Sequence, residues 1–253
     1  MKTDRIDKPS EQEADSVDCS SCPYDLKRRM HQSCQPGDCC VASASGRQIE
    51  RFFRKHPDEA VHFLVDSYWE RRAVAVRFAP LANLQAMTRD ADEVVRRAVA
   101  SRLAPPDLAA LLQDEDREVR LTVASRLPVS LLENLANDPD YLVRVCVAGR
   151  LPLGRLFRLI RDPDRQVREA VVRRLPEESL GLMRADPEPE IRRMVAERSS
   201  PEDADELLHD PDWTVRLAAV QHASSHCVAE LMSDPDPEVA AAIAARKHCW
   251  INT

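Results

Sequence analysis

Glycine and aromatic residues are both scarce in this sequence. Glycine occurs 5 times in 253 residues, and aromatic residues make up 4%. So few glycines exclude a glycine-rich phosphate-binding loop, and the sequence contains neither a Gly-x-Ser-x-Gly nor a His-Glu-x-x-His motif. So few aromatic side chains leave no obvious platform on which nucleic-acid bases would stack. We therefore predict no catalytic residues and a protein that is not an enzyme.

The chain also lacks a long apolar run and an excess of positive charge. No run approaches the ~18 apolar residues that would suggest a membrane span. The N-terminal stretch MKTDRIDKPSEQEADSVD lacks the apolar core of a signal peptide. The net charge of −7 does not favour nucleic acid as a partner. We expect a soluble cytoplasmic protein that binds neither a membrane nor nucleic acid.

The most regular feature of the sequence is a unit of 24 residues that recurs without insertions. Every unit begins with an aspartate, at Asp66, Asp90, Asp114, Asp138, Asp162, Asp186, Asp210 and Asp234. A fixed period in this range is the signature of a solenoid. Residues 66–253 are therefore predicted to form eight repeats, of which the last is truncated.

The unit DPDRQVREAVVRRLPEESLGLMRA, residues 162–185, shows what each repeat should form. Its opening Asp-Pro-Asp predicts a helix start, with proline in the first helical position. Aliphatic residues at positions 6, 10 and 14 fall on one helical face, and the proline at position 15 ends the helix. Leucines or their substitutes at positions 19 and 22 suit a second, shorter helical turn of 3₁₀ type. The predicted fold is an all-α solenoid.

Two columns of arginines run through the repeats. The arginine at position 7 lies four residues after an acid, as in Asp164 and Arg168, which predicts an ion pair within one helix. The position-13 arginines have no such local partner, and two interpretations stay open. They form an anion-binding stripe, or their guanidinium groups bond neighbouring helix carbonyls or the Asp column. These residues are Arg102, Arg126, Arg150, Arg174, Arg198 and Arg246.

Five of the eight cysteines fall within residues 19–40. Cys19-x-x-Cys22 can place two thiolates on one metal centre, and Cys34 with Cys39 and Cys40 can return one or two more. Because nothing suggests export to an oxidising compartment, a metal centre is favoured over disulfides. Zinc and iron–sulfur both fit the spacing.

The repeats and the cysteine cluster together resemble the leucine-rich repeat variant family. The repeat pattern D-P-D-x-x-V-R-x-x-V-A-x-R-L-P is nearly complete in residues 138–161. The resemblance implies a [4Fe–4S] cluster and a right-handed superhelix of alternating α- and 3₁₀-helices. It assigns Cys19, Cys22 and Cys34 as ligands, with Cys40 as the fourth because Cys40-Val41 matches the end of the family motif. Cys39 is the alternate fourth ligand. No strand-forming L-x-x-L-x-L stretch is present, so a β-lined horseshoe is not expected.

The predicted domain organisation has four parts. Residues 1–18 are expected to be a disordered tail and residues 19–45 an iron–sulfur cluster domain. Within the latter, the basic residues 27–29 either offset the charge of the cluster or form a solvated loop face. Residues 46–65 are predicted to be an N-terminal solenoid cap with Phe52 and Phe53 in its core, followed by the repeats.

Near the C-terminus, a set of histidines and cysteines suggests either a second metal site or the packing of a terminal cap. The set comprises His222, His226, Cys227, His248 and Cys249.

These features predict an iron–sulfur protein whose solenoid docks a protein partner, with the cluster in electron transfer or redox sensing. The alternative is an interaction scaffold with a purely structural metal centre, Fe–S or Zn. The family resemblance also implies a possible nitrogen-fixation context.

Overall fold

The protein is described here by a computed structural model, which covers residues 17, 19–20, 22–25, 34–231 and 233–251, the last three by their backbone alone. The expected tail, apart from residue 17, and the basic residues 27–29 lie outside the described residues. The chain divides into two compact units, residues 1–127 and 128–253. Within the described residues the only β-structure is one isolated antiparallel bridge between Gln35 and Cys39. The all-α prediction is therefore confirmed, without a sheet-lined surface.

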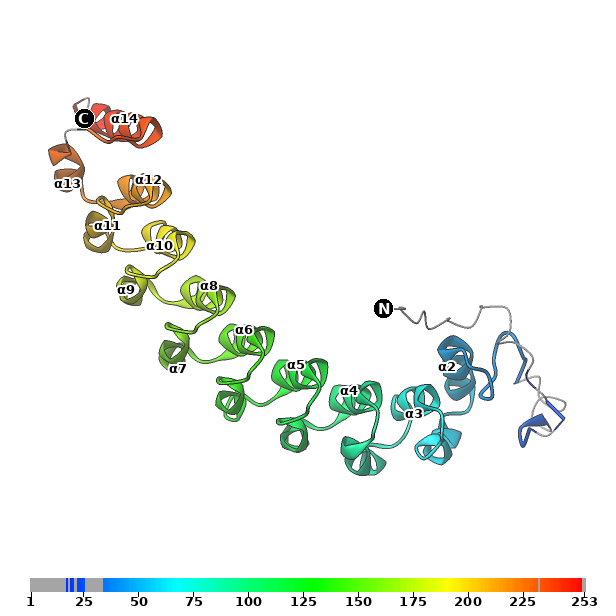
Figure 1. The fold of residues 1–253 in the computed structure, drawn as a ribbon. Coiled ribbons are helices and arrows are strands. Elements are labelled where there is room, and N and C mark those ends of the chain that lie inside the picture. Colours follow the sequence, from blue (N-terminus) through cyan, green and yellow to red (C-terminus); the bar gives the residue numbers. More distant parts are fainter. Residues whose placement is uncertain (1–16, 18, 21, 26–33, 232, 252–253) are drawn as a thin grey trace, which may run out of the picture. The chain divides into compact units, whose positions relative to one another are not determined.

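The first unit alternates α-helices with short 3₁₀-helices, as the repeat predicts (Figure 1). In it, α2 packs on α3, α3 on α4, and α4 on α5. In the predicted cap, residues 46–65, α2 is followed by a break at His56 and a 3₁₀-helix that begins at Pro57. The elements are α2 (Gly46–Lys55), η1 (Pro57–Phe63), α3 (Trp69–Val76), η2 (Leu81–Asn83), η3 (Gln85–Arg89), α4 (Glu93–Arg102), η4 (Pro105–Leu111) and α5 (Arg117–Arg126).

The second unit continues the pattern, but its short elements contain α-helical turns as well as 3₁₀ turns. Here α6 packs on α8, α8 on α10, α10 on α12, and α12 on α14. The elements are η5 (Leu132–Leu135), α6 (Tyr141–Arg150), α7 (Leu153–Leu156), η6 (Phe157–Leu159), α8 (Arg165–Arg174), α9 (Glu177–Leu180), η7 (Gly181–Met183), α10 (Pro189–Ala196), α11 (Pro201–Leu207), α12 (Trp213–His222), α13 (Ser225–Glu230) and α14 (Pro237–Ile251).

The core of each unit consists of the predicted aliphatic columns. In α8 the position-6 and position-10 residues, Val167 and Val171, are fully buried, and so is Leu175 at position 14. The position-19 leucines Leu108 and Leu156 are buried from the opposite side by the short helices. Each repeat thus buries one face of a long helix against one face of a short one, as a solenoid unit must.

The helices begin later in the unit than the sequence pattern suggested. In most repeats the N-cap is the aspartate at position 3; Asp164, for example, accepts a hydrogen bond from the Gln166 N–H at 2.8 Å. The aspartate at position 1 instead accepts the N–H of position 3, as Asp162 does from Asp164 at 2.9 Å. The proline at position 2 therefore precedes the N-cap in these repeats rather than occupying the first helical position. The prediction was wrong here because both aspartates suit a cap, and the position-1 carboxylate has another partner.

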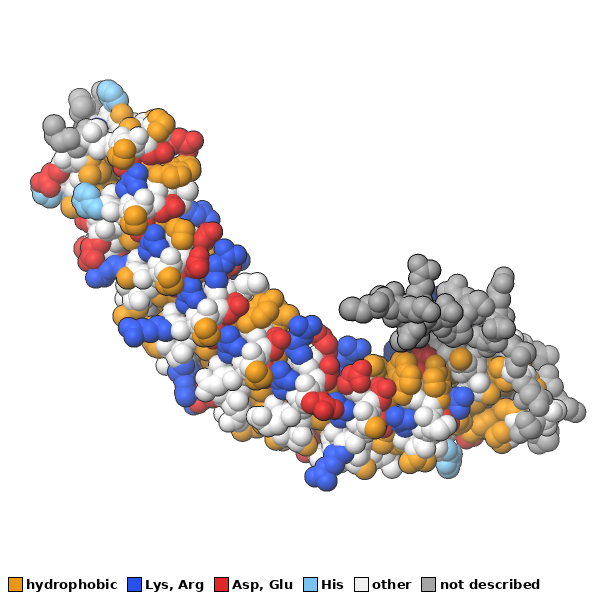
Figure 2. All heavy atoms as spheres, viewed as in Figure 1, with side chains coloured by type: hydrophobic (Ala, Val, Ile, Leu, Met, Phe, Trp, Pro, Cys, Tyr) orange, Lys and Arg blue, Asp and Glu red, His pale blue; other side chains and the backbone are white. Residues whose placement is uncertain are grey.

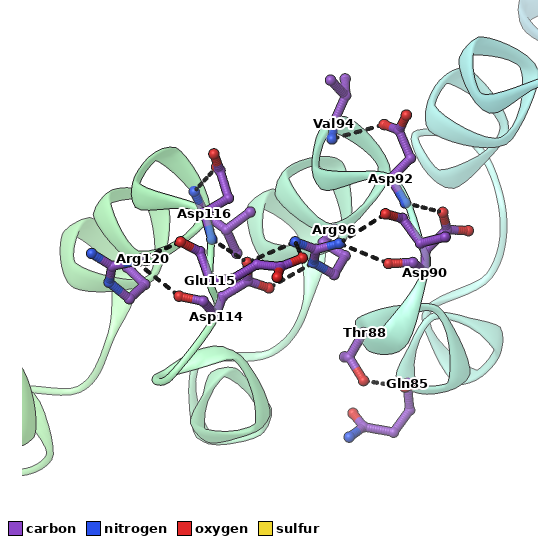
Figure 3. A network of polar contacts seen from close by, with 12 residues as sticks. Gln85, Thr88, Asp90, Asp92, Val94, Arg96, Asp114, Glu115, Asp116 and Arg120 are labelled. Atoms are coloured by element: carbon purple, nitrogen blue, oxygen red, sulfur yellow. Dashed lines mark hydrogen bonds and ion pairs between the residues drawn. The ribbon is translucent and has the colours of Figure 1, made fainter.

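That partner is the position-7 arginine of the preceding unit (Figure 3). The prediction of an ion pair within one helix was wrong, because each of these arginines reaches a carboxylate 18 residues further on. The Nε–Oδ2 distances are 2.7–2.8 Å, and a second bond to Oδ1 makes each pair bidentate. The pairs are Arg72–Asp90, Arg96–Asp114, Arg144–Asp162, Arg168–Asp186, Arg192–Asp210 and Arg216–Asp234.

The position-13 arginines bind backbone carbonyls at the C-terminal end of the preceding long helix. Arg174 donates to the carbonyls of Ala148 and Leu151 at 2.6 and 2.7 Å. Arg102 does the same with Val76 and Ala79. A cation suits this place because it satisfies carbonyls that have no partner in their own helix and meets the negative end of the helix dipole. The structure thus supports the carbonyl-bonding interpretation over an anion-binding stripe.

Candidate metal centre

Two short turns place the predicted thiols. The Cys22 N–H donates to the Cys19 carbonyl at 3.3 Å, which closes a tight turn around the first pair. The second group lies on a hairpin, residues 34–40, which we call the cysteine hairpin. Its arms are joined by two hydrogen bonds between Gln35 and Cys39, both of 2.7 Å.

The sequence Gln35-Pro36-Gly37-Asp38 dictates the hairpin turn. Proline fixes φ in the second position, and Gly37 takes φ 86° in the third, which only glycine adopts at little cost. The Asp38 N–H closes the turn on the Gln35 carbonyl at 3.0 Å. Because side chains alternate along paired arms, Cys34 and Cys40 share one face of the hairpin, whereas Cys39 belongs to the other.

The electrostatics of the thiols agree with this geometry. Burial, the neighbouring Cys40 and Cys22 thiols and a hydrogen bond between Cys34 and Cys40 together raise the pKa of Cys34 to about 12, with burial the largest cause. Burial also raises the pKa of Cys39, but Lys55 of α2 opposes that shift. Cys34 and Cys40 therefore lie within hydrogen-bond reach of one another with Cys22 nearby, and Cys39 lies near the positive charge of Lys55. This supports Cys40 over Cys39 as the fourth ligand.

The cap, residues 46–65, holds both turns. Gln48 of α2 accepts the Gly37 N–H at 3.1 Å through its side chain and the Cys40 N–H at 3.2 Å through its backbone carbonyl. On the other side, Tyr24, two residues after Cys22, donates to Glu59 at 3.0 Å.

An aromatic cluster joins the thiol segment to the cap and the cap to the first repeat. The ring of Tyr24 packs edge-on against Phe52 with centroids 5.0 Å apart. Phe52 and Phe53 are fully buried, which confirms them as core residues, and Phe53 contacts Phe78 after α3 at 6.0 Å. Arg77 of the first repeat also pairs with Glu50 of α2 at 2.9 Å. The thiols thus belong to the same packed assembly as the start of the repeats.

The donor set fits an iron–sulfur cluster. It consists of thiols alone, and soft thiolates select iron–sulfur clusters, zinc or copper(I). Among the described residues, no three His, Cys, Asp or Glu side chains are gathered as a single metal ion would need them. In a [4Fe–4S] cluster each of four thiolates would bind a separate iron. The buried Cys34 thiol would become a thiolate on binding iron, because a coordinated metal cation reverses the effect of burial.

The C-terminal histidines and cysteines form no such group within the described chain. His226 pairs instead with Glu230 at 3.3 Å on α13, and Cys227 is a hydrogen-bond partner of Asp205. The side chain of Cys249 lies outside the described residues. His222 and His226 are exposed, so the described residues support neither a second metal site nor a packed cap at these histidines.

Comparisons with known proteins fit this arrangement. Residues 13–62 match the family model described as the LRV protein FeS4 cluster, and residues 117–140 and 165–188 match the leucine rich repeat variant model. A solved structure described as a leucine-rich repeat variant with a novel repetitive protein structural motif is 60% identical, with a TM-score of 0.83. The similarity covers 91% of this chain and 98% of that one. No curated protein matches the chain.

The family match decides between zinc and iron–sulfur, which the spacing of the cysteines left open. The cofactor is a [4Fe–4S] cluster. The chain belongs to the leucine-rich repeat variant family and carries its iron–sulfur cluster domain.

Proposed function

We propose that this protein has a non-enzymatic redox role, in which the solenoid docks a protein partner and the cluster transfers an electron or reports redox state. The observation that carries the proposal is the attachment of both thiol turns to the cap through Tyr24 and Gln48. When bound, a [4Fe–4S] cluster supplies one-electron oxidation and reduction. A redox centre in the same chain as a recognition surface can respond to, or serve, the partner which that surface holds.

A groove of about 530 Å³ between α10 and α12 is the surface we propose for docking. Its wall includes Leu217, Ala218 and Trp213, whose surface is 40% exposed. Tryptophan is enriched among residues that dominate binding energy, and an exposed one is informative in a chain with three. On the other wall Arg193 and Glu197 pair with each other at 2.5 Å, so the groove offers an apolar anchor without net charge.

The surface charges argue for a protein partner over nucleic acid. Figure 2 shows acidic and basic side chains interspersed over the visible face of the described chain, without a broad basic area. Five of the six position-13 arginines donate to backbone carbonyls of the described chain and so add little to a basic stripe. No helix of the described residues is long and apolar enough to cross a bilayer. A cytoplasmic location and a nitrogen-fixation context remain part of the proposal.

The second candidate is an interaction scaffold whose cluster is purely structural. The same attachment favours it, because a cluster that ties the hairpin to the cap also closes the end of the solenoid. The aromatic core of the cap argues against a purely structural cluster. Phe52, Phe53 and Ile49 are fully buried and already cover the first repeat, so the end does not need a cluster to be closed.

Partner capture in two redox states tests the proposal. The protein is immobilised under anaerobic conditions. A lysate from cells that express a protein of this family is then passed over it with and without dithionite. We expect a captured protein that is lost with Trp213→Ala and retained with Trp69→Ala, a comparably exposed tryptophan of the other unit. If capture changed neither with dithionite nor with Trp213→Ala, both the redox-sensing role and the proposed docking surface would be contradicted. That result would favour an interaction scaffold with a purely structural cluster.

A further inference from the structure

One residue holds the turn and the returning arm of the cysteine hairpin. Gln48 lies in α2 and is 8% exposed. Its side-chain oxygen accepts the N–H of Gly37 at the turn, and its backbone carbonyl accepts the N–H of Cys40 on the returning arm. The distances of 3.1 and 3.2 Å are those of ordinary hydrogen bonds. The two contacts fix the turn and the ligand-bearing arm against the same helix.

The hairpin needs such support because its own bonds are few. Apart from the turn bond, the two Gln35–Cys39 bonds are its own backbone pairing, and an isolated two-stranded hairpin is marginal in water. Another polar contact with α2, between Arg51 and Asp38, joins side chains that are 56% and 52% exposed. Exposed ion pairs contribute little. The buried contacts of Gln48 therefore restrain the turn and the arm that carries Cys40 more than this pair does.

We propose that Gln48 is a positioning residue for the [4Fe–4S] cluster, and that the cluster and the cap helix α2 stabilise each other through it. Residues that orient metal ligands without touching the metal commonly change its retention about 10–100-fold. Because metal binding and folding are linked, the restraint acts in both directions. This inference rests on the presence of the cluster but not on partner docking. The positioning role of Gln48 and the docking proposal can therefore fail independently of each other.

The test compares three variants of the full chain, each loaded anaerobically. Gln48→Met removes the acceptor and keeps the length of the side chain. Gln48→Glu keeps an oxygen acceptor at the same place. Gln35→Met is the matched control, because Gln35 lies on the hairpin, is exposed, and bonds Cys39 through its backbone. The readouts are the rate of iron loss to a ferrous chelator, the EPR line shape of the reduced cluster, and hydrogen exchange at Gly37 and Cys40.

We expect Gln48→Met to lose iron about tenfold faster than the wild type, with a changed line shape and faster exchange at Gly37. Gln48→Glu should recover most of the loss, and Gln35→Met should behave as the wild type. Equal rates for Gln48→Met and Gln35→Met would overturn the positioning role. If Gln48→Met does not fold, the inference is tested on the wild type instead, by hydrogen exchange with and without the cluster. Removal of the cluster should speed exchange in α2 and leave α4 unchanged, and equal exchange in α2 with and without the cluster would overturn the inference.

Discussion

The cysteine hairpin and the repeats are held in place in different ways. In the repeats one contact recurs, since Arg168 reaches Asp186 just as Arg144 reaches Asp162. The hairpin depends on contacts that occur once, above all those of Gln48. A recurring contact appears as a column in the sequence, whereas a single one leaves no pattern. The difference teaches that periodicity reveals the scaffold of this protein and hides the residues that position its cofactor.

The sharpest test of this comparison lies within the hairpin, where two adjacent cysteines differ in their surroundings. Cys40 is hydrogen-bonded to Cys34, and Cys39 lies near the positive charge of Lys55 in α2. We expect Cys40→Ser to abolish cluster binding and Cys39→Ser to retain it, as measured by iron and sulfide per chain. Circular dichroism should show the helical repeats intact in both variants. Retention by Cys40→Ser together with loss by Cys39→Ser would reverse the ligand assignment.

Breaking one recurring ion pair should cost the repeats more than any exposed pair. In α8 the Arg168 and Asp186 side chains are 7% and 3% exposed, so Arg168→Ala leaves a buried carboxylate without its cation. We expect a loss of about 3–5 kcal/mol in the free energy of unfolding. The control on the same helix is Arg173→Ala, whose partner Glu169 lies one turn away at the surface, with an expected loss below about 0.5 kcal/mol. Similar losses in chemical denaturation would refute this ranking.

Two glycines should respond in opposite directions to the same substitution. Gly37 has φ 86°, so Gly37→Ala strains the hairpin turn by about 1–2 kcal/mol and should accelerate cluster loss. Gly149 lies within α6, and an added methyl group meets nothing within 4 Å. Gly149→Ala should therefore stabilise the second unit by roughly 0.5–1 kcal/mol. For both variants we would measure the rate of iron loss and the free energy of unfolding. If Gly37→Ala and Gly149→Ala changed stability in the same direction, the backbone roles assigned to these glycines would be contradicted.

Acid should weaken the repeats through two of the position-1 aspartates, Asp90 and Asp234. The hydrogen bond from Arg216 lowers the pKa of Asp234 below the ordinary 3.8. For Asp90, burial acts to raise the pKa, but the hydrogen bond from Arg72 helps to bring it below 3.8. Their contribution is thus complete above about pH 3.8 and is lost as the pH falls through the lower folded-state pKa. Arg72→Met should show a shallower acid dependence of unfolding than the wild type, and an identical slope would contradict this account.

Much of the fold follows from the repeat itself. The aliphatic columns predicted which residues are buried, and the proline at position 15 predicted where helices such as α8 end. The sequence could not show which of two aspartates caps the helix, because Asp162 and Asp164 both satisfy the local rule. That choice depends on the arginine 18 residues earlier, Arg144 for Asp162, and only the stacking of repeats brings the two together.

The ligand chemistry of the candidate site could be predicted from the sequence, but the residues that position the ligands could not. Five clustered cysteines indicated a thiolate-bound metal, and the motif around Cys40-Val41 favoured the ligand that the hairpin geometry also supports. Tyr24 and Gln48 were missed. A tyrosine two residues after a ligand and a glutamine on a cap helix are ordinary residues, and their roles follow from contacts 35 and 11 residues away in the sequence.

The most direct test of the central claim is iron and sulfide analysis joined to EPR on the anaerobically purified chain. The account predicts about four irons and four sulfides per chain. It also predicts a signal that appears with dithionite, disappears on reoxidation, and returns in a second cycle with the cluster intact. A full cluster that cannot be reduced and reoxidised would contradict a redox role and leave a structural centre.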